Sequence, residues 1–198
     1  MKISVILGHP YKKSFNHAIA ETVVNTLTEN NHQVFFHDLY AEQFDPVMKK
    51  EELETDVSID DLVIKHCEEI KEVDGIIIIH PNWWGQPPAI LKGWVDRVLR
   101  NEIAYSYVRG GRGNGLPFGL LKAQTGLVFN TSNTPTDREN SLFGDPLETL
   151  WKTCVFGFCD IQKVDRKTFS VVVESTPEQR AQWLKDSRQL VGKYFPKG

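Results

Sequence analysis

The sequence predicts an α/β fold: a doubly wound, five-stranded parallel sheet with helices on both faces. Two observations predict it. Five short apolar runs alternate with segments of helical spacing along the 198 residues. The runs are continuously apolar rather than alternating, which is typical of parallel strands covered on both sides. With no internal repeat or low-complexity tract, we expect one domain over residues 1–198.

The first half of the chain is expected to form three strands. The first run is β-branched and stops at the turn Gly8-His9-Pro10, and the third is the most hydrophobic run of the chain, as expected of a central strand. We expect strands at residues 3–7, 33–39 and 75–79, helices at 14–30 and 61–72, and a loop with a short helical stretch at 40–60.

The second half is expected to complete the sheet with two more strands. Thr176 followed by Pro177 is a helix start with proline at the first helical position. We expect helices at residues 88–100, 148–158 (weakened by Gly157) and 176–194, strands at 122–129 and 167–173, and a glycine-rich loop at 109–115.

Composition excludes several classes of protein. A net charge of −3 lacks the basic face of a nucleic-acid binder. Three cysteines without a CxxC pair argue against a disulfide framework or zinc module and favour a reducing cytoplasm. No signal peptide is visible, and no run approaches the roughly 20 apolar residues that span a bilayer. We therefore expect a cytoplasmic protein without membrane insertion.

Ligands of such folds bind outside the carboxyl ends of the strands, so the loops at residues 9–16, 80–88 and 130–143 are the candidates. In the first, Ser14 and Asn16 stand at the mouth of a helix with Lys12 and Lys13 nearby, which favours an anion such as phosphate. It is neither a P-loop nor a GxGxxG motif. Ser14 as a plain N-cap with solvated lysines is an equally good interpretation.

The other two loops suit a planar ligand. Trp83 and Trp84 are hard to place together in a core, so one can pack inward while the other forms a flat wall; a purely structural aromatic cap is the alternative. Residues 130–137 are small and polar and offer N–H and hydroxyl donors for carbonyl and ring-nitrogen acceptors. Residues 130–137 are informative because they follow a strand at the same sheet edge as the other two loops.

Together these residues resemble the NAD(P)H dehydrogenase (quinone) family of the flavodoxin-like superfamily, as a compact bacterial-type member. The resemblance covers nearly the whole chain, and PPAILKGWVDRV is its most specific motif. The motifs are GHPYKKSFN at 8–16, HDLY at 37–40, FDP at 44–46, PNWWGQPPAILKGWVDRV at 81–98, IAYSY at 103–107, FGDPLETLW at 143–151 and STPEQRAQWL at 175–184.

The resemblance implies a flavin site in the three loops. The positions matching the family's flavin contacts are His9, Ser14, Phe15, Asn16, Pro81, Asn82, Trp83, Trp84, Gly85, Asn130, Thr131, Ser132 and Asn133. Those expected to contact the substrate are Trp84, Tyr105, Tyr107 and Phe143, the two tyrosines closing the cavity of the partner subunit.

Two departures from the family pattern affect the expected chemistry. Animal members carry a Tyr and a His that assist charge transfer; Asp137 and Phe143 stand at or near those positions, so no catalytic residue is assigned. Gly85 replaces an aromatic ring, which predicts a more open substrate wall.

The function implied by the resemblance is that of a homodimeric, flavin-dependent NAD(P)H oxidoreductase. In a ping-pong cycle, a hydride would pass from NAD(P)H to flavin N5 and then to a quinone, or to a nitro or azo compound. FAD is favoured because the larger members of the family use it, and FMN, used by several compact bacterial members, is the alternative. The choice between NADH and NADPH is open. The other functions considered are a regulatory flavoprotein subunit of a potassium-efflux system and a flavodoxin-type electron carrier.

The remaining histidines and the cysteines are expected to have structural roles. His17, His32, His37 and His66 show no ligand spacing, so solvated or capping roles are expected and no metal site is predicted. Cys67, Cys154 and Cys159 are all expected to be buried and inert.

Overall fold

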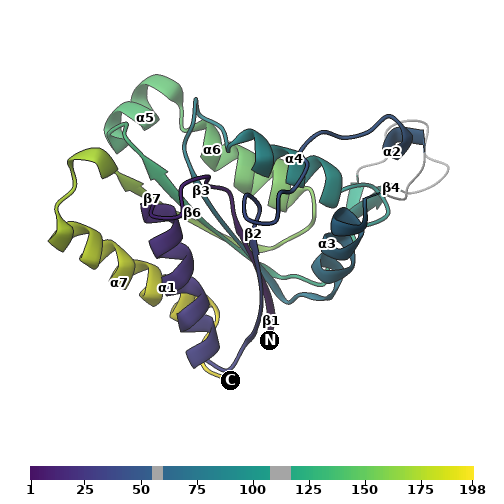
Figure 1. Ribbon diagram of the computed structural model, residues 1–198, viewed down its shortest axis with the longest axis horizontal. Coiled ribbons are helices and arrows are strands. Elements are labelled where there is room, and N and C mark those ends of the chain that lie inside the picture. Colours follow the sequence, from purple (N-terminus) through teal and green to yellow (C-terminus); the bar gives the residue numbers. More distant parts are fainter. Residues whose placement is uncertain (55–59, 108–116) are drawn as a thin grey trace.

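The computed structural model describes residues 1–54, 60–107 and 117–198, and the predicted glycine-rich loop lies outside them. Its centre is a parallel five-stranded sheet in the order β2-β1-β3-β6-β7 (Figure 1). The strands are β1 (Lys2–Leu7), β2 (Gln33–Asp38), β3 (Gly75–Pro81), β6 (Thr125–Ser132) and β7 (Lys163–Ser170). The predicted doubly wound α/β fold is confirmed.

Helices cover both faces of this sheet. On one face, α1 (Phe15–Glu29) and α7 (Pro177–Tyr194) lie side by side, and on the other lie α3 (Asp61–Glu72), α4 (Ala89–Val98), α6 (Pro146–Glu148) and the π-helix η1 (Thr149–Gly157) (Figure 1). Short helices complete the list: α2 (Glu51–Glu54), α5 (Thr136–Phe143) and the 3₁₀ turn η2 (Val172–Glu174). Among the helices of the described ranges, none combines the length and hydropathy that crossing a bilayer requires.

The central strand shows why the apolar runs have no alternation. Every residue of β3 is buried, because side chains on both sides of the strand meet a helical layer. Ile76 and Ile78 pack with the α3 and α4 layer, whereas Ile77 and Ile79 pack with the α1 and α7 layer. The strand is thereby fixed between two cores, and its carboxyl end at His80 and Pro81 is held rigidly.

The helix starts follow local capping signals. Ser14, Asp60 and Thr176 each accept a hydrogen bond from a backbone N–H of the first turn of the helix that follows. Because such bonds join residues two or three positions apart, these starts were predictable from the sequence alone.

Three predicted elements need correction. β6 begins at Thr125 rather than residue 122, and β7 ends at Ser170 rather than residue 173. The two strands pair from Thr125 with Lys163 to Ser132 with Ser170, so β7 also begins four residues earlier than the predicted residue 167, and this pairing sets the ends of both strands. The predicted helix over 148–158 is mostly a π-helix, a distinction that apolar spacing cannot make.

Several short elements were not predicted, among them one strand pair and one helix. An antiparallel pair, β4 (Tyr105–Tyr107) and β5 (Pro117–Gly119), stands apart from the main sheet. Helix α5 lies inside the segment expected to be the third loop, and it ends at Gly144 with a left-handed φ of 70°. Both elements are short, and their sequences carry little periodicity.

Candidate active site

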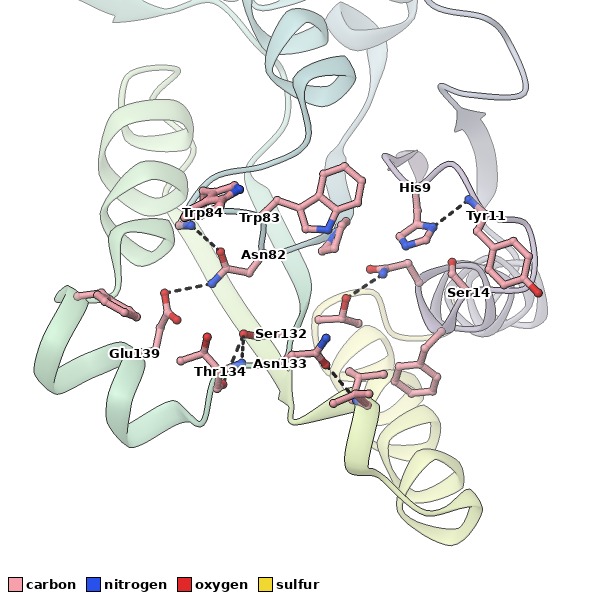
Figure 2. A pocket seen from close by; sticks show the side chains of 18 of the residues that line it. His9, Tyr11, Ser14, Asn82, Trp83, Trp84, Ser132, Asn133, Thr134 and Glu139 are labelled. Carbon is pink, nitrogen blue, oxygen red and sulfur yellow. Dashed lines mark hydrogen bonds between the residues drawn. The ribbon is translucent and has the colours of Figure 1, made fainter.

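A cavity of about 890 Å³ opens at the carboxyl ends of β1, β3 and β6, where the three predicted loops meet (Figure 2). Of the residues expected to contact a flavin, all but Asn130 line it, and so does Phe143. The lining residues are His9, Tyr11, Ser14, Phe15, Asn16, Pro81, Asn82, Trp83, Trp84, Gly85, Thr131, Ser132, Asn133, Thr134, Glu139, Phe143, Pro146, Val172, Val173 and Arg180.

One side of the cavity, here named the α1 wall, consists of His9, Ser14 and Asn16 with His17 and Asp38 behind them. The Ser14 Oγ accepts the His17 N–H at 3.3 Å and lies 2.9 Å from His17 Nδ1. The first N–H groups of a helix have no partner within it and, with the helix dipole, attract anions. The α1 wall therefore suits a phosphate or carboxylate.

Asn16 contributes an unused acceptor to this wall. It is 2% exposed, and its Nδ2 donates to Thr131 Oγ1 at 2.8 Å. Within the described residues, its Oδ1 has no hydrogen-bond partner. A buried carbonyl without a partner costs free energy, so this atom favours a ligand that brings a hydroxyl or N–H donor.

The opposite side, named the loop wall, consists of residues 81–85 together with Glu139. Asn82 organises it: its Oδ1 accepts the Gly85 N–H at 2.9 Å and its Nδ2 donates to Glu139 Oε1 at 3.0 Å (Figure 2). Trp84 and Gly85 both have left-handed backbone, with φ of 58° and 70°. Hydrogen bonds from Asn82 thus stabilise a turn that its own sequence disfavours.

Neither tryptophan packs inward, which corrects one expectation. Trp83 is 42% exposed and Trp84 is fully exposed. The turn at residues 82–85 directs both side chains away from the core, so a structural cap is also excluded for Trp84. Both indoles are left available to a planar ligand or to another protein surface.

Beneath the loop wall lies His80, which is fully buried. Its Nδ1 donates to the Pro81 carbonyl at 2.8 Å, while its Nε2 accepts from Trp151 Nε1 at 2.9 Å and from Asn130 Nδ2 at 2.7 Å. Burial lowers the pKa of His80 to about 4, so the ring is neutral with a fixed tautomer.

Asn130 belongs to this buried network, not to the cavity lining. Its side chain is 0% exposed, bridging His80 and the guanidinium of Arg166, which lies 3.1 Å from Asn130 Oδ1. Arg166 also pairs with Asp145 and Glu148. Inward and outward positions alternate along a strand, so Asn130 points away from the surface that Thr131 faces. Asn130 therefore positions the loop.

Several lining residues are not predicted by the sequence patterns: Tyr11, Thr134, Glu139, Pro146, Val172, Val173 and Arg180. The Thr134 N–H donates to Ser132 Oγ, and Arg180 donates to the carbonyl of Val172. A signal existed for Glu139 and Thr134, which lie in the predicted third loop. Arg180 lies on α7, well beyond the end of that loop at Phe143, and no local pattern marked it as a lining residue.

The two tyrosines lie outside this cavity. Tyr105 stacks edge-on against Phe158 with ring centroids 4.7 Å apart, and Tyr107 is exposed on the same strand. Their expected role in the cavity of a partner subunit stays a prediction.

Two of the remaining histidines differ from expectation. His37 and His66 are buried, and with Glu42 they form a cluster whose potential ligand atoms lie within 4.8 Å of one another. The Trp94 indole donates to His66 Nδ1 at 2.9 Å, which places the ring proton on Nε2, the atom a metal would need. His37 in turn lies between the carboxylates of Glu42 and Glu69 at 2.9 and 2.8 Å. His66 Nε2 lies 3.4 Å from Glu42 Oε2, and neither atom has a hydrogen-bond partner among the described residues, so the cluster is only partly hydrogen-bonded.

Cys154 was expected to be buried but is exposed, because it lies on the outer side of the π-helix. Cys67 and Cys159 are buried as expected, and burial raises the pKa of each thiol to about 11. All three are free thiols.

Comparison with curated proteins finds relatives along most of the chain. An uncharacterized NAD(P)H oxidoreductase of Haemophilus influenzae is 34% identical over 83% of this chain and 81% of its own length. NAD(P)H dehydrogenase [quinone] 1 of Cavia porcellus is 27% identical over 91% of this chain and 72% of its own.

Solved structures agree with these relatives. Smu.1420 from Streptococcus mutans is 31% identical, has a TM-score of 0.84 and covers 98% of this chain and 100% of its own. An FMN-dependent NADH-azoreductase from Bacillus anthracis, in complex with FMN, shares the fold with a TM-score of 0.77 at 15% identity, covering 98% of this chain and 100% of its own. Residues 1–191 match the Flavodoxin_2 family model, described as a flavodoxin-like fold. The chain therefore belongs to the Flavodoxin_2 family, and its resemblance to the quinone-reductase branch is confirmed.

Proposed function

We propose that this protein is an FMN-dependent NAD(P)H oxidoreductase that reduces quinones or related conjugated acceptors. The observation that carries the proposal is a single cavity with an anion-binding wall at one end and an aromatic loop wall at the other. A flavin nucleotide has the same two parts, a phosphate and a conjugated ring, joined by a chain of hydroxyls. The curated relatives named NAD(P)H oxidoreductase and NAD(P)H dehydrogenase support this function.

The residues fit such a cofactor. The α1 wall would hold its phosphate through Ser14 and the first N–H groups of α1. The unpartnered Asn16 Oδ1 is an acceptor for a ribityl hydroxyl. Trp83 and Trp84 would flank the ring, and residues 131–133 would present donors to its polar edge.

We propose FMN as the cofactor, although the family resemblance favoured FAD. The α1 wall accounts for one phosphate, and no described feature marks an adenine pocket. Two neighbours in fold were solved in complex with FMN, at 15% and 18% identity. Both flavins share the first phosphate, so identification of the released cofactor decides between them.

The bound flavin would supply hydride chemistry, and the protein's residues would orient and stabilise it. Donors at residues 131–133 would stabilise negative charge at the ring's polar edge during reduction. The neutral His80 keeps that loop in place without adding a competing charge. With Trp84 fully exposed and glycine at position 85, the loop wall leaves room for NAD(P)H and the acceptor to bind in turn.

We also propose a cytoplasmic homodimer of one flavin-binding domain per chain. Trp84, Tyr107 and Phe118 are exposed by 44% or more of their surface, and pairing of two chains would cover such aromatic surface. In this arrangement Tyr105 and Tyr107 of one subunit would close the cavity of the other. The three free thiols are consistent with a reducing compartment.

The test begins with the absorbance spectrum of the purified protein and chromatography of the flavin released on denaturation. Anaerobic NADPH or NADH should bleach the flavin band, and a quinone should restore it. Released FMN supports the cofactor proposal, and released FAD overturns that part alone. A flavin that neither nicotinamide reduces would contradict the oxidoreductase and favour an electron carrier or a regulatory subunit. Failure to bind any flavin after reconstitution would reject the whole proposal.

A further inference from the structure

Ser14, His17 and Asp38 form a continuous hydrogen-bonded chain behind the α1 wall. The Ser14 Oγ lies 2.9 Å from His17 Nδ1, and His17 Nε2 lies 3.2 Å from Asp38 Oδ2. The other carboxylate oxygen of Asp38 accepts the backbone N–H groups of Tyr40 and Ala41, both at 3.2 Å. Asp38 is therefore fixed in place, and it fixes the ring of His17.

These bonds determine where the protons lie. A carboxylate only accepts, so the neutral His17 ring carries its proton on Nε2 and Nδ1 accepts the hydroxyl proton of Ser14. In that state the Ser14 hydroxyl is donated to His17 and is not available to a ligand. Protonation of Nδ1 reverses this bond: His17 then donates to the Ser14 oxygen, and the hydroxyl is free to donate into the cavity.

A phosphate at the start of α1 would favour the protonated state for two reasons. It needs the Ser14 hydroxyl as a donor, and its negative charge stabilises a nearby imidazolium. Asp38 stabilises the same cation from the other side, as an aspartate does in a hydrolase triad. The side chains of His17 and Asp38 are only 17% and 15% exposed, so solvent screening is reduced.

The surrounding groups leave His17 as the residue that takes the charge. The ring of His9 lies 6.1 Å away, and burial, assisted by His17, lowers the pKa of His9. Lys12 and Lys13 are exposed. Asp38 is the carboxylate that contacts His17 among the described residues.

We propose that binding of the cofactor's phosphate is coupled to uptake of one proton from solvent at His17 Nδ1, with Asp38 as the positioning residue. The inference rests on the proposed flavin function. The proton converts Ser14 from a donor to His17 into a donor to phosphate. Affinity for a phosphorylated flavin should then decrease with increasing pH, whereas affinity for an unphosphorylated flavin should not.

The experiment compares FMN with riboflavin, which lacks the phosphate. Apoprotein is titrated with each flavin by fluorescence from about pH 7 to about pH 9, where the phosphate, whose second pKa is about 6, keeps both charges. The FMN-to-riboflavin affinity ratio should fall by up to about tenfold per pH unit, the slope of one linked proton. Calorimetry of FMN binding in two buffers of different ionisation enthalpy counts the same proton directly.

Two variants separate this role from a structural one. In His17→Gln, the FMN-to-riboflavin affinity ratio should no longer depend on pH. Asp38→Asn presents an amide to Nε2 and places the ring proton on Nδ1, so the ratio should also be flat while FMN still binds. His32→Gln is the matched control, because His32 lies beyond the other end of α1 and bonds the Phe195 carbonyl. It should keep the wild-type slope.

A wild-type ratio that is flat with pH would overturn the proposal, as would an unchanged slope in His17→Gln. Failure of both FMN and riboflavin to bind at any pH would instead reject the proposed function. The two failures are distinguishable because only the phosphate differs between the ligands.

Discussion

The two walls of the cavity are built in different ways. The α1 wall depends on residues close in sequence: Ser14 caps the helix that contains Asn16 and His17. The loop wall depends on a distant contact, because Asn82 is bound to Glu139, 57 residues away along the chain. One wall has ordinary helical geometry, and the other has two consecutive residues with left-handed φ.

This difference predicts that the two walls bind different parts of the ligand. Changes in the α1 wall should affect ligands that carry a phosphate, whereas changes in the loop wall should affect every flavin alike. The comparison of FMN with riboflavin therefore reports which wall has been altered. Stability should follow the same division, since the loop wall rests on the buried network around His80.

The largest expected effect is a loss of folding stability in acid, caused by the buried His80 beneath the loop wall. Unfolding restores the pKa of His80 from about 4 to 6.5, so the unfolded state binds the proton first as pH falls. Stability should therefore be lost between pH 6.5 and about 4, by about 3 kcal/mol.

Urea unfolding at several pH values measures this loss. The His80→Gln variant, whose amide can both accept and donate, should lack this loss, except for the contribution of the same sign that the lowered pKa of His9 makes. The pKa of Glu42 is lowered from 4.5 to about 2, so its own contribution is lost mainly below pH 4.5 and overlaps only the acid end of this window. An unfolding free energy that is constant between pH 6.5 and 4 would contradict the assignment.

The second effect isolates the α1 wall. Ser14→Asp retains a capping oxygen for the His17 N–H but adds a negative charge beside the expected phosphate. FMN affinity should fall on the order of 100-fold, with riboflavin affinity almost unchanged. Ser14→Ala is the complementary variant, because it removes the cap without adding charge and should cost about 1 kcal/mol of stability. Equal losses for FMN and riboflavin in Ser14→Asp would show that no phosphate binds there.

The third effect isolates the loop wall. Glu139→Ala removes the acceptor for Asn82 Nδ2 and loosens the turn at residues 82–85. Affinities for FMN and riboflavin should both fall about tenfold, in parallel. Glu139→Gln keeps an acceptor oxygen and should stay within about threefold of the native affinity. A loss confined to FMN would mean that Glu139 serves the α1 wall instead.

The smallest effect compares two glycines of equal φ. Gly85 and Gly144 both have φ of 70°. A Cβ added at Gly85 would lie 2.8 Å from Pro146 Cγ, whereas a Cβ added at Gly144 would have no heavy atom within 4 Å among the described residues. Alanine at Gly144 should cost about 1 kcal/mol for its left-handed backbone, and alanine at Gly85 about 1 kcal/mol more for overlap. Thermal unfolding of the two variants measures the difference, and equal losses would show that Pro146 gives way freely.

The fold and most of the cavity were predictable from local features. Capping residues, apolar runs and turn residues act over a few positions, and they located the sheet, the main helices and the three loops. The family motifs then identified most of the lining residues, and Asn130 was the one expected flavin contact that does not line the cavity. Missed features such as α5, Arg180 and the β4–β5 pair depend on contacts that no short stretch encodes.

By itself the sequence determined the parallel sheet, the sheet edge at which the cavity opens and the capped start of α1, because hydrophobic periodicity and capping bonds are short-range. Tertiary structure decided the rest. Strand register moved the ends of β6 and β7, and burial made His80 and Asn130 a support beneath the cavity rather than part of its lining. It also brought Asp38 from β2 to the side chain of His17 on α1. Hydrogen-bond and charge partners of this kind are set by proximity in space, so their consequences for protonation emerge only in the folded chain.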